Sequence, residues 1–585
     1  MKLKQRFQPF LQAIPKLLLF QFVSTVILTL VTWGISLLGS LLLGLSGKAA
    51  VTSGNLSFLF TRWQGYVMII LLLAMVTIYV AVELNALIIF CNKTLDGEKV
   101  SVWQCIKEGF IGLKKFLSLR GVVVILYAVV LAPIFGLGFS ISLTQNFYIP
   151  KFIMSVIEAT PLFMTAYIIV GVFLTVVAFV YCFILHGTLL NDMTMKEASV
   201  HARKLFVKNW KNLLVELLIF FLLAVLTAVV VIGVCGVLPL LIVQAIPMGE
   251  SVKAFFTIFF SVIIILLCAI AAYSYVSLLM IKLTSLYKKY TSEGEEWSYQ
   301  PQEKKRHPVV ITVVALLLVA SIGFSVYAVG HFDELFKTQV DGNIVAHRAA
   351  GVEAPENTVK GIDVAYQYGA LGSEIDIQRT SDGHYVVNHD ADFERVAGVA
   401  KAPEEMTLAE VKELRVDGEP VPTLEEMLDA SKDKVILFVE LKGATADNQM
   451  ADDAVRIIKE KGMQDQAVLI SLKMDILEYI EEKYPEMQTG YLAFVSLGYI
   501  EETPFDYLAL EEEISTDETI ESVHQKGKKI IVWTVNDEED IEHFMLSDAD
   551  AIITDSVKLS GEVKERLSNR STSEIIFQQA LRLVQ

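Results

Sequence analysis

Long apolar stretches fill the first 330 residues of the chain and constrain its fold more than any other feature. A helix needs about 20 apolar residues to cross the hydrocarbon core of a bilayer. Seven stretches meet this requirement: 17–45, 66–91, 121–145, 161–186, 213–247, 254–281 and 309–330. The sequence therefore predicts an all-α polytopic membrane domain over residues 1–330, embedded in a lipid bilayer. Gly233, Gly236 and Pro239 leave open whether the fifth stretch is one helix or a hairpin.

Basic residues are concentrated in every second loop of this membrane domain. They cluster at the N-terminus and after the second, fourth and sixth stretches, whereas the intervening loops carry few of them. By the positive-inside rule, the N-terminus is cytoplasmic. Seven crossings would then place the rest of the chain outside the cytoplasm. All five cysteines lie in the membrane domain, so no disulfide framework is expected beyond it.

The composition changes at residue 331. Residues 331–585 hold 24 Lys and Arg against 53 Asp and Glu, and this acidity speaks against nucleic-acid binding. We divide the chain into the membrane domain, a short linker (331–342), a barrel (343–560) and a C-terminal helical tail (561–585). The tail is expected to be amphipathic and to pack on the barrel or touch the membrane.

Short runs rich in Val and Ile alternate with helix-like segments after the linker. Eight such runs predict strands: 344–347, 373–378, 435–441, 468–472, 489–493, 507–510, 529–535 and 551–554. Eight strands alternating with helices over about 220 residues predict a parallel (β/α)8 TIM barrel. A doubly wound open sheet is the alternative. Asp382-Gly383 predicts an additional hairpin after the second strand.

Polar side chains follow three of these strands and the hairpin. His347 and Arg348 end the first strand, and His389 follows the hairpin. Glu374 and Asp376 are two residues apart on the second strand and therefore point to one face. Glu440 and Lys442 end the third strand in the same way. Because TIM-barrel active sites form at the carboxyl ends of the strands, we expect these groups to meet there.

The residue types indicate a metal-dependent reaction on an anion. Glu374, Asp376 and Glu440 offer the oxygen ligands that one Ca2+ or Mg2+ prefers. His347 and His389 suit general acid–base chemistry, and Arg348 and Lys442 suit an anionic substrate. Taken singly, each of these residues is more simply explained as part of a solvated surface. Together at strand ends they are harder to dismiss, because burial of unpaired charge is costly.

An ordered series of motifs resembles the glycerophosphodiester phosphodiesterase family. The series comprises His347-Arg348, Pro355-Glu356-Asn357-Thr358, the segment 374–390, Val439-Glu440-Leu441-Lys442, Trp533-Thr534-Val535-Asn536 and Thr554-Asp555. The layout is similar to the subgroup with an N-terminal multi-span membrane domain. One departure is Ala349, where the family commonly has Gly directly after His-Arg.

The resemblance implies a TIM barrel that hydrolyses glycerophosphodiesters to sn-glycerol 3-phosphate and an alcohol. It implies metal ligands and an acid–base pair at the residues already singled out, and phosphate-binding groups at Arg348 and Lys442. Trp533 would line the mouth of the barrel. In the family's mechanism, a glycerol hydroxyl attacks phosphorus with help from one histidine, the other protonates the leaving alcohol, and water opens the cyclic phosphate.

The sequence therefore predicts a cell-membrane phosphodiesterase that acts outside the cytoplasm on a glycerophosphodiester or a glycerol-phosphate polymer. One alternative is a membrane transporter or partner-binding protein whose barrel is a non-catalytic sensor. Another is a phospholipase-like enzyme that acts on intact lipid.

Overall fold

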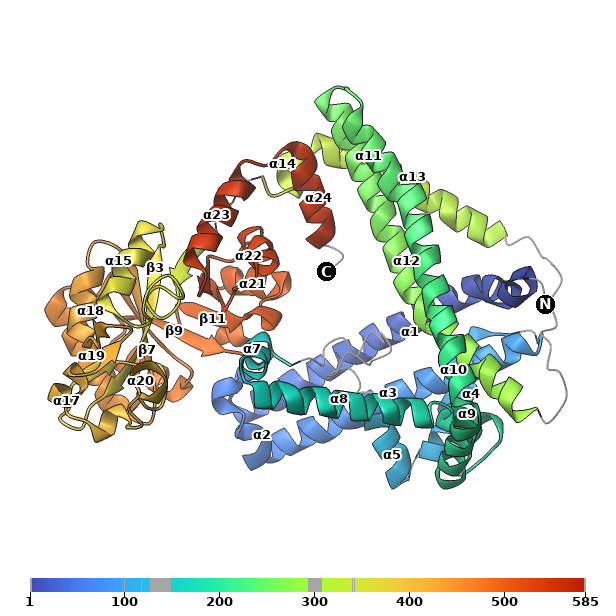
Figure 1. The fold of residues 1–585 in the computed structure, drawn as a ribbon, viewed down its shortest axis with the longest axis horizontal. Helices are drawn as coiled ribbons and strands as arrows, with labels where there is room; N and C mark the ends of the chain where they lie inside the picture. The colour runs from blue at the N-terminus through green and yellow to red at the C-terminus, as the bar shows by residue number, and fades with distance from the viewer. Residues whose placement is uncertain are drawn as a thin grey trace. The chain divides into compact units, whose positions relative to one another are not determined.

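The computed structural model describes residues 3–98, 100–116, 118–126, 149–292, 308–338, 340 and 342–582. The chain forms two compact units, drawn together as ribbons in Figure 1. A helical unit consists of Met1–Leu37, Ile69–Phe336 and Thr572–Gln585. A barrel unit consists of Leu38–Met68 and Lys337–Ser571. The barrel unit thus contains a segment from the predicted membrane domain.

Six helical segments in the described part of the chain are long and apolar enough to cross a membrane. They comprise α1 (Leu3–Ser46), α3 (Trp63–Leu95), α8 (Pro161–Tyr181) with α9 (Ile184–Leu190), α10 (Met195–Ile232) with α11 (Leu238–Ala245), α12 (Glu250–Thr291) and α13 (Pro308–Gly330). They match six of the seven predicted stretches. Most of the remaining stretch, 121–145, lies outside the described residues.

The fifth predicted stretch is one continuous helical path and not a hairpin. A π-helical turn at Gly233–Val237 joins α10 to α11. Pro239 stands in the first turn of α11, where its missing N–H costs little. The chain therefore passes these helix breakers without reversing.

Shorter helices complete the helical unit: α4 (Val102–Gly112), α5 (Leu119–Leu126), α7 (Lys151–Ala159), α14 (Phe332–Leu335) and α24 (Thr572–Arg582). Helix α24 is the amphipathic C-terminal helix that the sequence predicts. Its Ile575 and Ile576 share a buried cluster with Ala254 and Ile258 of α12 and Ala328 of α13. This part of the predicted tail packs on helices of the helical unit, whereas Val563 and Leu567, earlier in the tail, belong to the main core of the barrel.

Eight parallel strands form a closed barrel in the second unit. They are β2 (Asn343–Ala346), β3 (Gly372–Arg379), β7 (Ile436–Leu441), β8 (Ala467–Ser471), β9 (Gln488–Ala493), β11 (Tyr507–Glu511), β12 (Lys529–Trp533) and β13 (Ala551–Thr554). Each strand pairs with the next in this order, and β13 pairs with β2 to close the ring. The predicted TIM barrel is confirmed.

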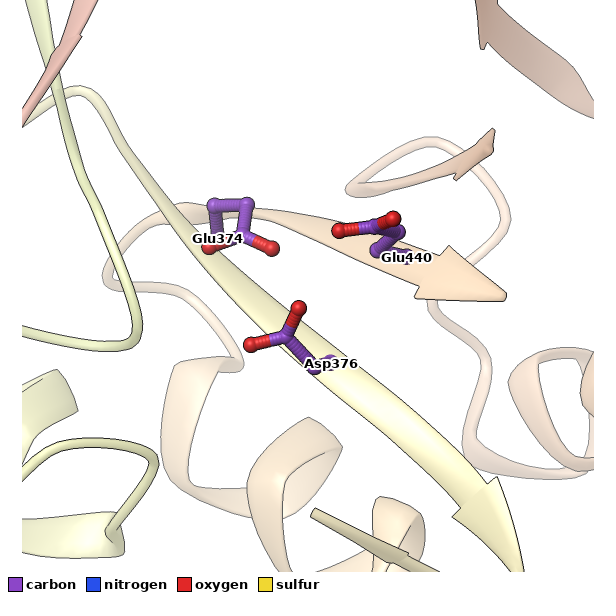
Figure 2. Close-up of side chains that lie close together, drawn as sticks. All are labelled: Glu374, Asp376 and Glu440. Carbon is purple, nitrogen blue, oxygen red and sulfur yellow. The ribbon is translucent and has the colours of Figure 1, made fainter. Parts of the chain in front are cut away.

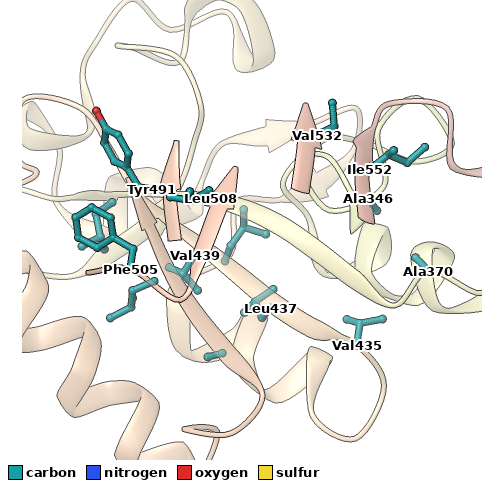
Figure 3. Packing of buried hydrophobic residues seen from close by; sticks show 14 of the residues in the cluster. Ala346, Ala370, Val435, Leu437, Val439, Tyr491, Phe505, Leu508, Val532 and Ile552 are labelled. Atoms are coloured by element: carbon teal, nitrogen blue, oxygen red, sulfur yellow. The ribbon is translucent and has the colours of Figure 1, made fainter. Parts of the chain in front are cut away.

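Helices surround the strands, as Figure 1 shows. They are α15 (Val359–Gln367), α18 (Leu424–Ser431), α19 (Asn448–Lys461), α20 (Met474–Lys483), α21 (Asp517–Gln525), α22 (Glu538–Met545) and α23 (Val557–Ser568). Strand side chains alternate between two cores. Leu437 and Val439 join the larger core, part of which is drawn in Figure 3, whereas Phe438 belongs to a second cluster with Val345 and Val468. Complete burial of each such side chain contributes about 1.5–3 kcal/mol.

The predicted hairpin is present and returns the chain to the carboxyl end of β3. Strand β4 (Tyr385–Val387) pairs antiparallel with β3, and Gly383 in the turn has φ +86°. The backbone N–H of Asn388 donates to the carbonyl of Asp376 at 3.0 Å. An insertion follows, with α16 (Glu394–Ala397), α17 (Leu408–Lys412), β5 (Arg415–Val416) and β6 (Glu419–Pro420). The hairpin thus places residue 389 beside β3.

A short strand from the loop between α1 and α3 is part of the barrel unit. Strand β1 (Ala50–Thr52) pairs antiparallel with β10 (Ser496–Gly498), which comes directly after β9. A 3-10 turn, η1 (Ser53–Asn55), and helix α2 (Phe58–Thr61) complete the loop. All three residues of β1 are buried. The loop is therefore packed into the barrel unit and is not a free connection.

Candidate active site

The carboxylates singled out in the sequence meet at the carboxyl ends of β3 and β7. Parallel pairing sets Asp376 opposite Glu440, and Glu374 lies two residues before Asp376. One oxygen of each of the three side chains lies within 4.8 Å of the others. Figure 2 shows the three carboxyl groups converging from the two strands. They are 0–6% exposed, so the cluster is buried as well as acidic.

Lys442 is the cation in direct contact with this cluster. Its Nζ lies 2.9 Å from Asp376 Oδ1 and 3.1 Å from Glu440 Oε2. Burial lowers the pKa of Lys442, but Asp376 and Glu440 raise it more, so the ammonium is charged. Burial raises the pKa of Asp376, yet Lys442 and His389 outweigh it and hold this pKa well below its usual range.

Burial and crowding raise the pKa values of the other two carboxyls. Burial raises the pKa of Glu374 well above its usual range, and Asp376 and Glu440 raise it further. Burial likewise raises the pKa of Glu440 to about 7, against the opposing effect of Lys442. Only when all three carboxyls are ionised do they carry more negative charge than one ammonium balances, so a bound cation would favour their ionised forms. An oxygen-only donor set of this kind fits Ca2+ or Mg2+, which Glu374, Asp376 and Glu440 would hold.

His347 is oriented by a carboxylate from the far end of the barrel sequence. Its Nδ1 lies 2.7 Å from Asp555 Oδ1, and its Nε2 lies 4.0 Å from Glu374 Oε2. Asn536 donates to the other oxygen of Asp555 at 2.7 Å. Burial raises the pKa of Asp555, but the hydrogen bond and charge of His347 prevail and lower it to about 2. Asp555 is therefore ionised at neutral pH.

His389 has an equivalent partner in its neighbour. Its Nδ1 lies 2.9 Å from Asp390 Oδ1, and Arg395 Nε donates to the other oxygen of Asp390 at 2.7 Å. Burial lowers the pKa of His389, and Asp376 only partly offsets this effect. The imidazole is therefore neutral at pH 7.

Arg348 extends the same network. Its Nη1 donates to Glu356 Oε2 at 3.4 Å, and Glu356 also accepts two bonds from Arg395. The buried Nε of Arg348 has no hydrogen-bond partner among the described residues. A buried, unsatisfied guanidinium donor beside a carboxylate cluster is a suitable contact for an anionic substrate.

The backbone after β2 wraps around Glu374. Arg348 N donates to Glu374 Oε2 at 2.9 Å, and Ala349 N donates to the Glu374 carbonyl at 2.7 Å. Arg348 and Ala349 adopt φ +46° and +77°, a left-handed conformation that costs a non-glycine residue about 1–2 kcal/mol. Glycine at position 349 would adopt this conformation without the cost.

Trp533 stands at the end of β12. Its Nε1 donates to the Ala509 carbonyl on β11 at 2.8 Å, and its ring packs against the cluster inside the barrel. The side chain is partly exposed. Its place at a strand end is that of an aromatic residue on the rim of the barrel.

Sequence reasoning singled out the acidic and basic groups but not their supports. Asp555 appeared in the sequence analysis only as part of the Thr554-Asp555 motif, with no role assigned. Its position directly after the last predicted strand could have indicated that it belongs to the site. Asp390 was visible as the residue after His389. Asn357, a residue of the Pro355–Thr358 motif, donates to Asp376 Oδ2 at 2.9 Å. Arg395 carried no signal.

Two family models match the chain. Residues 3–325 match the membrane domain of glycerophosphoryl diester phosphodiesterase, and residues 347–559 match the glycerophosphoryl diester phosphodiesterase family. A glycerophosphodiester phosphodiesterase from Caldanaerobacter subterraneus subsp. tengcongensis is 30% identical over 231 residues, which are 36% of this chain and 93% of that protein.

Two further proteins give a similar result. A glycerophosphodiester phosphodiesterase from Bacillus subtilis (strain 168) is 24% identical over 256 residues, covering 38% of this chain and 86% of that protein. The crystal structure of a glycerophosphodiester phosphodiesterase from Parabacteroides distasonis is 25% identical, with a TM-score of 0.36, and covers 39% of this chain and 98% of that one.

Proposed function

Because the chain belongs to the glycerophosphoryl diester phosphodiesterase family and is a multi-pass membrane glycerophosphodiester phosphodiesterase, we propose that the residues described above release sn-glycerol 3-phosphate and an alcohol. The observation that carries the proposal is the meeting of three buried carboxyls with two histidines, each paired with an aspartate. This set contains a cation site and two proton carriers within one barrel end.

The charged groups divide between cation and phosphate. Glu374, Asp376 and Glu440 would hold one Ca2+ or Mg2+. When bound, such an ion neutralises charge that develops on the phosphate oxygens. Arg348 and Lys442 bind the phosphate from the protein side, and this role is supported by the unsatisfied Nε of Arg348. Trp533 contacts the glycerol or the leaving alcohol at the rim.

The two histidines are proposed to have different roles in the reaction. Neutral His389, with Nδ1 bonded to Asp390, uses Nε2 to take the proton of a neighbouring glycerol hydroxyl, whose oxygen attacks phosphorus. His347, which the Asp555 carboxylate orients through Nδ1, gives a proton from Nε2 to the departing alcohol. The phosphate is then cyclic, and water opens it as the histidines return the protons.

The barrel is proposed to act outside the cytoplasm. Basic loops support a cytoplasmic N-terminus, and α1 then carries the chain across the membrane. The loop after α1 pairs with β10, so the barrel must share the side of the membrane on which this loop lies. Both observations support an extracytoplasmic barrel.

The decisive assay uses the full chain in detergent with glycerophosphoglycerol and glycerophosphocholine, with Ca2+, with Mg2+ or with EDTA. We expect release of sn-glycerol 3-phosphate that EDTA abolishes. His347→Ala and His389→Ala should each lower kcat by about 10² to 10⁴-fold. His384→Ala is the matched control, because this histidine lies half-exposed in the hairpin turn.

Two results would contradict the proposal. Turnover that is unchanged in both histidine variants would exclude the acid–base pair. Faster turnover of intact phospholipid than of either deacylated substrate would replace the proposed substrate class with a lipid.

A further inference from the structure

The loop between the first two membrane helices makes a specific contact with the barrel. Ala50, Val51 and Thr52 pair with Gly498, Leu497 and Ser496, respectively. The ladder continues through Tyr499 N to the Ala49 carbonyl and Ser53 N to the Val495 carbonyl, both at 3.1 Å. Ala50 is 3% exposed and belongs to the main hydrophobic cluster of the barrel. We call the loop residues 49–55 together with β10 the clamp.

The clamp lies at the carboxyl end of the strands. Tyr491, near the carboxyl end of β9, is fully buried, and its hydroxyl lies 2.5 Å from that of Thr52. Gly54 N donates to the same hydroxyl at 3.2 Å. A Cβ on Gly54 would stand 2.4 Å from the carbonyl oxygen of Leu472, which comes directly after β8. This end of β8 and β9 is the end at which β7, the neighbour of β8, carries Glu440.

The same loop has its two ends in membrane helices. Helices α1 and α3, which flank it, are both apolar enough to cross a bilayer. Phe60, Trp63 and Tyr66, at the start of α3 and just before it, are 50–63% exposed. Aromatic side chains at the ends of membrane helices favour the headgroup level. The clamp therefore ties the catalytic end of the barrel to a loop whose exposed aromatic side chains favour the headgroup level of a bilayer.

We propose that the clamp positions the mouth of the barrel for glycerophosphodiesters that are anchored to the membrane by a lipid, in preference to the same group free in solution. This inference rests on the proposed function and adds its substrate class. Thr52, Gly54 and Tyr491 are positioning residues in this scheme and do not touch the reacting atoms. The anchored group could be a single headgroup unit or the first unit of a polymer, since both present the same phosphodiester.

The test uses the full chain reconstituted in vesicles and two substrates with the same reactive unit. One is soluble glycerophosphoglycerol, and the other is glycerophosphoglycerol joined through a spacer to a dialkyl lipid in the vesicle. Gly54→Val should undock the loop, and Tyr491→Phe removes two hydrogen bonds but keeps the ring. We expect the ratio of kcat/KM for anchored over soluble substrate to fall at least tenfold in Gly54→Val and by a smaller factor in Tyr491→Phe.

Gly44→Val is the matched control, because a Cβ at Gly44 meets no atom within 4 Å. Its ratio should equal that of the wild type. An unchanged ratio in Gly54→Val overturns the inference. Equal loss of both activities in Gly54→Val and Tyr491→Phe also overturns it, because the clamp would then serve folding alone. Wild-type protein inactive on both substrates would instead contradict the proposed function.

A disulfide checks the contact directly. Thr52 and Ser496 form a pair between the hydrogen-bonded pairs of the ladder, where side chains come closest. Oxidation of Thr52→Cys/Ser496→Cys should join β1 and β10 by a disulfide, which keeps the peptides that contain the two cysteines together after proteolysis. Each single cysteine variant is the reference. If the double variant forms no such disulfide, the contact between β1 and β10 is contradicted.

Discussion

Each histidine is held through its Nδ1 by an aspartate, His347 by Asp555 and His389 by Asp390. The first prediction concerns Asp555. Its carboxylate fixes the Nδ1 side of His347 and leaves Nε2 for the proton transfer. Asp555→Asn should therefore lower kcat by about 10² to 10⁴-fold with little change in KM. Steady-state kinetics of the full chain measure this split. Asp548→Asn, an exposed carboxylate on the same unit, is the control, and equal kcat in both variants would contradict the assignment.

The carboxylate cluster predicts stabilisation by a divalent cation. Ca2+ or Mg2+ at 100 times its Kd should stabilise the barrel by about 2.7 kcal/mol, because the folded state alone presents the site. For a domain of this size the midpoint of thermal unfolding should rise by several degrees. Glu440→Gln removes one ligand and should abolish this rise, while Glu518→Gln on the exposed face of α21 should not. An equal rise in both variants would place the ion elsewhere.

Glu511, at the carboxyl end of β11, predicts a pH-dependent stability. Burial raises its pKa to about 8, and the neighbouring Glu513 adds to this effect. An unfolded glutamate titrates near about 4.3, so the folded state holds the proton more tightly. The contribution is fully present below about pH 4.3 and is lost as pH rises through about 8. Glu511→Gln should therefore raise the unfolding temperature relative to wild type more at pH 9 than at pH 5.

An exposed carboxylate gives the reference for this comparison. Glu518→Gln should change the unfolding temperature equally at both pH values. If Glu511→Gln also changes the unfolding temperature equally at pH 5 and pH 9, Glu511 is ionised in the folded protein and the prediction is wrong.

What sequence could predict at this scale depended on chain distance. Glu374 and Asp376 share a strand, so their spacing alone predicted a common face. The partner of His347 lies 208 residues away, and only the closure of β13 against β2 brings Asp555 to it. Local patterns carry no signal for such a pair.

At the scale of elements, the turn after β2 predicts different effects of substitution at two positions, 349 and 351. Gly351 has φ +60°, and a Cβ there would stand 2.0 Å from the Asp555 carbonyl oxygen. Gly351→Ala should lower the unfolding temperature by several degrees and reduce activity, since the turn carries Arg348. Ala349→Gly should stay within about 1 kcal/mol of wild type, because relief of the left-handed strain offsets the lost methyl packing. Thermal unfolding of both variants checks this, and equal destabilisation would contradict it.

Elements differ in how well sequence predicts them. The eight barrel strands were predicted to within two residues at each end because apolar or alternating runs of four or more residues between helix-like segments carry a strong signal. Strands β1 and β10 were missed, since three residues are too few for a period and their pairing spans more than 440 residues. The clamp therefore could not be predicted from the sequence and is known only from the structure.

At the scale of the whole molecule, the β1–β10 pairing links two predictions that sequence treated separately. Charge bias in the loops orients the helices, and the motifs place the chemistry in the barrel. Because the first loop is hydrogen-bonded to the barrel, one orientation determines the side of both. If the predicted orientation of the membrane helices is wrong, the catalytic end of the barrel therefore lies on the opposite side of the membrane as well.

Cysteine labelling of intact cells with a membrane-impermeant maleimide tests this linkage. Lys401→Cys on the barrel and Ala49→Cys on the first loop are exposed positions that should react before lysis. Lys204→Cys, exposed near the start of α10, should react only after lysis, because the basic loop there is predicted to be cytoplasmic. The unmodified chain corrects for the five native cysteines, none of which lies in the barrel. Opposite labelling of Lys401→Cys and Ala49→Cys would break the same-side argument. Reaction of Lys204→Cys alone before lysis would reverse the orientation and return the barrel to the cytoplasm.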